Sequence, residues 1–181
     1  MRIVIQRVSQ ASVSLNAPHT PSDVSRKTPD PLFPEEAALN EIPQGTTHTS
    51  GAGFMLLVGV SDTDTEKEAQ WAAKKIANMR IFPDAEGKMN LSLLDTHGSI
   101  LSISQFTLFG DIHKGNRPSF ISAGEPVHAE QLWHVLNTLL ADEYSIRVAE
   151  GWFGADMAVS ITNEGPTTIL LDTDRDMPHK A

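Results

Sequence analysis

The sequence predicts an α+β fold of layered mixed and antiparallel sheets with two main helices. Three observations favour this class: strand-like segments outnumber helical ones, several strands follow one another directly, and only two long segments have helical periodicity. The expected order is roughly βββαβαβββ within a single domain over residues 1–181. A doubly wound nucleotide-binding fold, in which strands and helices alternate, fits this order less well.

The N-terminal part predicts a hairpin and then a buried strand. Residues 2–8 are rich in β-branched side chains, and residues 11–15 alternate apolar and polar residues with a period of two. Residues 54–60 form a continuous apolar run, which is typical of a central strand covered on both faces. Further strands are expected at 100–108, 145–149, 158–162 and 167–172.

Two helices are expected, at about 64–79 and about 127–141. The first begins at Thr63-Asp64-Thr65-Glu66, which resembles a capping box. In the second, apolar residues follow the spacing i, i+3, i+4, i+7. Both helices should pack their apolar faces against the sheet.

Residues 16–50 differ in composition from the rest of the chain. They hold six of the eleven prolines and are otherwise mostly polar, so we expect an irregular, partly disordered insertion after the second strand. A helical turn is predicted within it at 34–39, because proline is tolerated at a helix start and acidic residues favour the first turn. A short flexible tail is expected from about residue 174.

Composition excludes several classes of function. With no cysteine, the chain has no thiolate nucleophile, thiolate metal site or disulfide framework. No apolar run approaches the roughly 20 residues needed to cross a bilayer, so we expect a cytoplasmic protein with no membrane partner. The net charge of −9 argues against broad wrapping of duplex nucleic acid but leaves room for a local RNA contact.

Common catalytic signatures are missing from the sequence. There is no Gly-rich phosphate loop, nucleophile elbow or H-E-x-x-H motif, and the seven histidines lack the spacing of metal ligands. We therefore expect no metal site. His113 and His128 remain candidate general bases, since a histidine titrates near neutral pH.

Two unusual stretches are candidate functional elements. The segment around Ser104-Gln105-Phe106-Thr107 combines hydroxyls, an amide and an aromatic ring, which suits a polar ligand with a ring to stack. The alternative is an edge strand with solvated hydroxyls. The second stretch, Asn163-Glu164-Gly165-Pro166-Thr167-Thr168, is either an ordinary turn or a cis Gly-Pro element that presents two carbonyl oxygens in one direction.

Together these stretches resemble the two signature motifs of the D-aminoacyl-tRNA deacylase family, S-Q-F-T and N-x-G-P-x-T. The similarity covers residues 1–15 and about 53–173 and includes Arg117-Pro118-Ser119-Phe120 and Phe153-Gly154-Ala155-Asp156-Met157. The chain departs from the family in its long insertion and in having Glu164 and Thr167 where aspartate and valine are more usual.

The resemblance implies a homodimer that acts on aminoacyl-tRNA with no metal or organic cofactor. Its implied reaction is hydrolysis of the ester that joins a D-amino acid, or glycine mischarged on tRNA(Ala), to the 3′-terminal adenosine. The Gly-cisPro element formed by Gly165 and Pro166 of one protomer would enter the partner's pocket and reject L-amino acids. This activity is a proofreading step of translation quality control.

The resemblance also assigns roles to individual residues. Ser104, Gln105, Phe106 and Thr107 are the expected catalytic-site residues. From the residues themselves we expect a positioning role for Thr107 and not that of a nucleophile, because no general base stands at a recognisable spacing from it. The expected supporting or substrate-binding residues are Arg7, Phe153, Met157 and Asn163.

Two other functions stay open. A relative with relaxed chirality would edit L-aminoacyl-tRNA, and a non-catalytic tRNA-binding scaffold would use the insertion to recruit a partner. Turnover of L-aminoacyl-tRNA would indicate the first, and binding without turnover the second.

Overall fold

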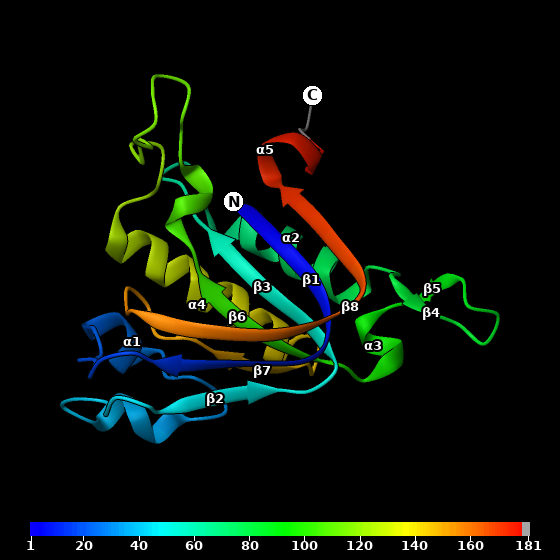
Figure 1. The fold of residues 1–181 in the computed structure, drawn as a ribbon, viewed down its shortest axis with the longest axis horizontal. Helices are drawn as coiled ribbons and strands as arrows, with labels where there is room; N and C mark the ends of the chain where they lie inside the picture. The colour runs from blue at the N-terminus through cyan, green and yellow to red at the C-terminus, as the bar shows by residue number, and fades with distance from the viewer. Residues whose placement is uncertain (179–181) are drawn as a thin grey trace.

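The computed structural model describes residues 1–178, which form an α+β fold around one mixed sheet (Figure 1). The strand order is β2-β1-β3-β6-β7, and β8 pairs with β1 off this path. The elements in chain order are β1 (Arg2–Leu15), α1 (Asp23–Lys27), the 3-10 helix η1 (Pro34–Ala38), β2 (Thr47–Ser50), β3 (Gly53–Gly59), α2 (Glu66–Asn78), β4 (Phe82–Pro83), β5 (Met89–Leu91), α3 (Leu93–Thr96), β6 (Ser99–Ser104), the 3-10 helix η2 (Phe106–Phe109), α4 (Pro126–Asp142), β7 (Arg147–Glu150), β8 (Met157–Asp172) and α5 (Thr173–Asp176). The α+β class and the two main helices are confirmed.

The sheet separates two apolar cores. Alternate residues of β3 face opposite sides, so Phe54 and Leu56 pack in the first core and Met55 packs in the second. The helices α2 and α4 cover the first core together (Figure 1). β3 is thus covered on both faces, as its continuous apolar run predicts.

β1 is one long strand, not the hairpin expected from 2–8 and 11–15. It pairs with β3 through its first half, with β2 near its end and with β8 along its length. The polar residues Ser9 and Gln10, which separate the two predicted strands, lie exposed beside register shifts in the pairing with β8. These shifts let the strand bend without ending.

The predicted strands 158–162 and 167–172 are likewise one strand, β8. Its pairing with β1 is interrupted around Gly165 and Pro166, which bulge between Asn163 and Thr168. Pairing then resumes toward Asp172. A proline removes one ladder donor, but a bulge accommodates it without ending the strand.

The end of one strand and the start of one helix differ from the sequence prediction. The predicted strand 100–108 ends at Ser104, and the chain then turns into η2. β6 lies between β3 and β7, so the edge-strand alternative is wrong. The capping box of α2 is formed by Thr65 and Glu68, two residues later than expected.

The insertion is more ordered than its composition predicts. It contains α1, η1 at the predicted helical turn, and β2, which extends the main sheet. Ile42 is buried in the second core, and Leu32 and Phe33 pack against that core. The C-terminal tail begins with α5, whose first residue, Thr173, is buried. Within residues 1–178, no helix is long and apolar enough to cross a membrane.

Candidate active site

A pocket of about 550 Å³ opens where the carboxyl ends of β3 and β6 meet the start of α4. Parallel strands bring their carboxyl ends to one edge of a sheet, where the chain leaves the sheet and ligands commonly bind. The lining residues are Val58, Val60, Ile103, Ser104, Gln105, Phe106, Ala123, Gly124, Pro126, Ala129, Trp133, Phe153, Gly154, Ala155, Asp156, Met157 and Val159. Five of the predicted site residues are therefore brought together here.

The first motif forms one wall. Ser104 ends β6, and the backbone N–H of Gln105 still donates to the Val58 carbonyl at 2.7 Å, which fixes the turn out of the sheet. Phe106 is 58% exposed and meets Phe120 edge to face, with ring centroids 5.0 Å apart. An exposed ring held by a second ring is well suited to stack on a planar ligand.

Thr107 is exposed and does not line the pocket. Its hydroxyl oxygen accepts a hydrogen bond from the Gln105 side-chain amide. The candidate bases do not line the pocket either: His113 is exposed on a loop, and His128 bonds to the Asp64 carbonyl at 3.1 Å. Among the described residues, no histidine is placed to activate this hydroxyl.

The opposite wall comes from the segment between β7 and β8. Phe153 and Met157 supply apolar surface there. The Met157 sulfur accepts a hydrogen bond from the Trp152 backbone N–H at 3.3 Å. A Cβ on Gly151 would lie 3.0 Å from this sulfur, so the glycine permits the close approach.

Trp133 and Asp156 are lining residues that sequence reasoning did not single out. Trp133 projects from α4 and its indole N–H donates to the buried Ser102 hydroxyl at 2.9 Å. Asp156 is the one ionisable residue among those that line the pocket in the described chain. Its carboxylate accepts from the Asn16 amide at 3.0 Å. Only its place in the family-like run 153–157 marked it in the sequence.

The second motif lies outside this pocket. Asn163, Gly165 and Pro166 are exposed on β8, and none of them lines the pocket of the same chain. The peptide bond between Gly165 and Pro166 is cis. Gly165 has a φ of +113°, and a Cβ there would lie 2.8 Å from Thr167 Oγ1 and 2.9 Å from Arg7 Nη2. The positive φ strains any L side chain at this position, and Thr167 and Arg7 would have to shift to admit a Cβ, so glycine is favoured here.

Arg7 lies beneath the second motif. Its side chain is buried, and its Nε donates to the Glu164 carbonyl oxygen at 3.2 Å. One terminal nitrogen, Nη1, donates to the Ile81 carbonyl oxygen. A guanidinium can make both bonds at once, because its donors point in different directions within one plane.

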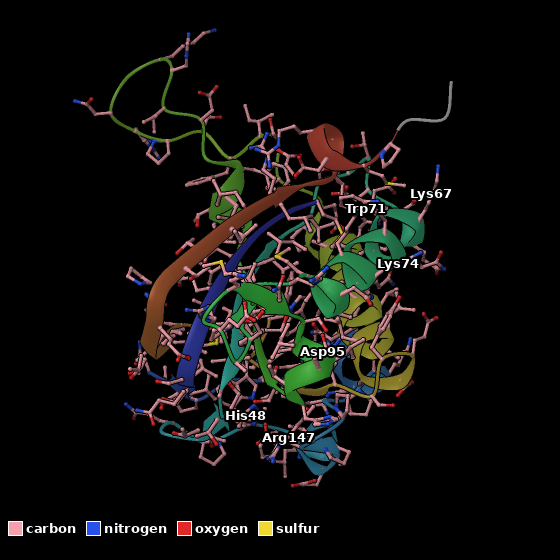
Figure 2. The ribbon with its side chains drawn as sticks, turned by 90° about the vertical axis from the view of Figure 1, so that its right-hand side faces the viewer. His48, Lys67, Trp71, Lys74, Asp95 and Arg147 are labelled. Atoms are coloured by element: carbon pink, nitrogen blue, oxygen red, sulfur yellow. The ribbon has the colours of Figure 1, made fainter. Side chains whose placement is uncertain are left out.

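No basic residue within 1–178 lines the pocket. Lys74 lies on the outer side of α2 with Lys67 and Trp71, whereas His48 and Arg147 lie at the other end of the molecule (Figure 2). Lys114 and Arg117 are exposed on the loop that leads to the pocket-lining residues 123–124. The pocket is therefore an apolar and aromatic cleft with one carboxylate.

The chain is similar to known proteins over nearly its whole length. The family model described as D-Tyr-tRNA(Tyr) deacylase matches residues 4–172. A D-aminoacyl-tRNA deacylase of Bifidobacterium longum subsp. infantis is 49% identical over 180 residues, covering 98% of both chains. The D-aminoacyl-tRNA deacylase of Bifidobacterium adolescentis is 51% identical over 174 residues, covering 96% of this chain and 98% of the other.

Solved structures are similar as well. The c-Myc DNA unwinding element binding protein superimposes with a TM-score of 0.75 and 33% identity, over 95% of this chain and 98% of that chain. A probable eukaryotic D-amino acid tRNA deacylase has a TM-score of 0.69 at 17% identity, over 94% and 97% of the two chains, which is a likeness of fold alone. The family match spans nearly the whole chain and includes both motifs, so this protein belongs to the D-Tyr-tRNA(Tyr) deacylase family.

Proposed function

We propose that this protein hydrolyses the ester between a D-amino acid and the 3′-terminal adenosine of tRNA, as the names of its relatives indicate for them. Water adds to the ester carbonyl, the bond to the ribose 3′ oxygen breaks, and that oxygen takes up a proton. The products are the free D-amino acid and the tRNA. Glycine mischarged on tRNA(Ala) is a second proposed substrate, and the setting is proofreading in the cytoplasm.

The observation that carries this proposal is the pocket formed by Ser104, Gln105 and Phe106. Phe106 offers a ring on which the terminal adenine can stack, while the hydroxyl and the amide offer hydrogen bonds to its polar edge. The apolar wall at Phe153 and Met157 encloses the site. A pocket of about 550 Å³ suits one aminoacylated nucleoside better than a length of duplex.

We assign the choice between D and L to the backbone of Gly165 and Pro166. Their carbonyl oxygens would hold the α-ammonium of the substrate, so that an L side chain collides with this backbone and a D side chain points outward. Glycine has no side chain and would pass. A thousandfold preference requires only about 4 kcal/mol, which one steric clash supplies.

The Gly-Pro element would act on the pocket of a second copy of the chain. In support, Gly165 and Pro166 are exposed and do not line their own pocket. Among the described strands β8 pairs with β1 alone, and its Val159 and Leu170 are 39% and 61% exposed. An exposed strand edge with apolar side chains favours association of two copies.

Catalysis would rest on the substrate and the backbone. The adjacent 2′-hydroxyl of the terminal ribose would assist the attack of water, since no histidine lines the described pocket. Backbone N–H groups at Phe106 and Thr107, in the first turn of η2, would stabilise the developing oxyanion. Thr107 would hold the Gln105 amide in place.

The primary test compares metal-free hydrolysis of D-tyrosyl-tRNA and L-tyrosyl-tRNA by the purified protein. Rapid D-selective release is expected. Equal rates on both would instead indicate an L-editing relative, and binding without release from either would indicate a tRNA-binding scaffold.

Complementation tests whether Gly165 and Pro166, here called the gate, act on the pocket of the partner subunit. One variant keeps its pocket but carries Gly165→Ala, and the other keeps its gate but has its pocket filled by Ala123→Trp. If dimers form at random, half are mixed and one of their two sites is intact, so mixing restores about one quarter of wild-type activity. No restoration in verified mixed dimers would contradict action in trans.

A further inference from the structure

A buried polar cluster joins the insertion to the end of β7. His48 of β2 is 2% exposed, and its two ring nitrogens face two acceptors. Nδ1 lies 2.6 Å from the Glu150 carbonyl oxygen and Nε2 lies 3.0 Å from the Glu36 carboxylate. A protonated imidazole donates to both at once. The side chain thus links η1, β2 and β7.

The same cluster holds Trp152. The indole N–H of Trp152 donates to the second oxygen of Glu36 at 2.9 Å. The His48 ring lies between two aromatic rings: Phe33 stacks on it at 3.8 Å, and Trp152 meets it at 4.3 Å. The Glu36 carboxylate is therefore shared between a ring of β2 and a ring of the segment that follows β7.

Asp30 of the insertion completes the contacts to this segment. Its carboxylate accepts from the Glu150 backbone N–H at 2.9 Å. The N–H and the carbonyl of Glu150 are thus both bound by insertion side chains. The Glu150 carboxylate is held separately by His134 of α4, at 3.0 Å.

These contacts lie directly behind a wall of the pocket. The indole N–H of Trp152 donates a hydrogen bond to Glu36, and its backbone N–H donates one to the Met157 sulfur. Met157 and Phe153 line the pocket, and Phe153 is the residue next to Trp152. A shift of Trp152 would therefore move the surface on which the substrate rests.

We propose that Glu36, with His48 and Asp30, positions residues 150–157 and thereby sets the substrate-binding wall of the pocket. The insertion is then a brace for the active site and not a separate module. This inference rests on the proposed function for its kinetic consequence, but its structural consequence is independent of that function.

The kinetic test uses Glu36→Gln, with Glu35→Gln as the matched control. Glu35 is the exposed neighbour in the same helical turn, so the control makes the same change of charge outside the cluster. We expect Glu36→Gln to raise KM for D-tyrosyl-tRNA by about tenfold with little change in kcat, as for the loss of one charge-assisted hydrogen bond. The control should match the wild type.

The KM and kcat values separate positioning from general stability. A merely structural role would lower the fraction of folded enzyme, so that kcat falls and KM stays constant. If Glu36→Gln fails to fold, Trp152→Phe removes the same indole hydrogen bond while keeping an aromatic ring at this position. An unchanged KM in a folded variant would overturn the proposal.

A second readout does not depend on activity. With methyl-¹³C methionine the six methionines give six resonances, and Met157→Leu assigns the one from Met157. We expect Glu36→Gln to shift this resonance and Glu35→Gln to leave it in place. A wild-type enzyme inactive on D-tyrosyl-tRNA would contradict the proposed function, whereas an unmoved Met157 resonance in Glu36→Gln would contradict the brace.

Discussion

The Nε of Arg7 donates a hydrogen bond to the carbonyl oxygen of Glu164 across 3.2 Å. This bond connects the middle of β1 to the residue that precedes Gly165. The guanidinium is buried and is also bonded to the Ile81 carbonyl, so it cannot move without losing a second contact. The orientation of the Gly-Pro backbone is consequently tied to a side chain of the neighbouring strand.

Gly165→Ala should lower kcat/KM for D-tyrosyl-tRNA by at least about tenfold, a loss of about 1.4 kcal/mol. The new Cβ would lie within 3 Å of both Thr167 and Arg7, at a φ that L residues rarely adopt. Gly115→Ala is the matched control, because its φ of +115° is nearly the same but nothing lies within 4 Å of its Cβ position. Equal losses in both variants would contradict a gate at Gly165.

Arg7→Lys should reduce the discrimination between D- and L-aminoacyl-tRNA more than it reduces the stability of the fold. Lysine keeps the positive charge but has one nitrogen, which cannot bond to Glu164 and Ile81 from the two positions that the guanidinium uses. We expect the ratio of D-tyrosyl to L-tyrosyl hydrolysis to fall by about tenfold. Arg147→Lys, at an exposed position of β7, should leave the ratio unchanged. An unaltered ratio in Arg7→Lys would show that Arg7 does not hold the Gly-Pro backbone in its selective orientation.

Local signals predicted the elements that depend on local chemistry. The apolar run of β3 and the helix α4 were both found from the sequence, since burial on both faces and helical periodicity leave a direct pattern. β1 was divided wrongly into strands at 2–8 and 11–15, on either side of the polar Ser9 and Gln10. Only the pairing with β8, more than 150 residues away, carries the strand through them.

The insertion shows the limit of composition more clearly. Its prolines and polar residues predict an irregular loop, yet Glu36 and His48 find hydrogen-bond partners about 100 residues further along the chain. No short-range pattern records such contacts. The same holds for the pocket: the motif at 104–106 identified one wall, whereas Trp133 lines it because α4 packs across β6.

Thr107→Ala should retain kcat within about threefold of the wild type. The hydroxyl accepts from Gln105 and does not line the pocket, so its removal loses an orienting contact and no nucleophile. Single-turnover hydrolysis of D-tyrosyl-tRNA measures this directly. An inactive Thr107→Ala enzyme that still folds and binds tRNA would show that the threonine takes part in the chemistry.

A tRNA with a 2′-deoxy terminal adenosine should be hydrolysed at least about a hundredfold more slowly, the range expected when an assisting proton-transfer group is removed. The charged D-amino acid and the rest of the tRNA stay the same, so KM should change little. Comparable rates on the ribose and deoxyribose substrates would indicate that the assisting group belongs to the protein and not to the substrate.

The stability provided by His48 should depend on pH with a defined sign. Burial alone would lower the pKa of His48, but its bonds to Glu36 and to the Glu150 carbonyl, with the nearby Asp30 carboxylate, raise the pKa above the ordinary 6.5. Burial opposes ionisation of Glu36, yet bonds from His48 and Trp152 hold its pKa below the ordinary 4.5. Burial also raises the pKa of Asp30, the other carboxyl group that faces the ring.

A raised histidine pKa stabilises the folded state fully below about pH 6.5, and this contribution is lost as the pH rises through the folded-state value. The lowered pKa of Glu36 stabilises the folded state above about pH 4.5, and this contribution is lost as the pH falls through the folded-state pKa. The pair should therefore contribute most between these limits. In thermal unfolding, the difference in Tm between the wild type and His48→Asn should be larger at pH 6 than at pH 8.5, while the exposed control His113→Asn shows no such trend. A difference that stays constant with pH would mean that His48 is held neutral in the cluster.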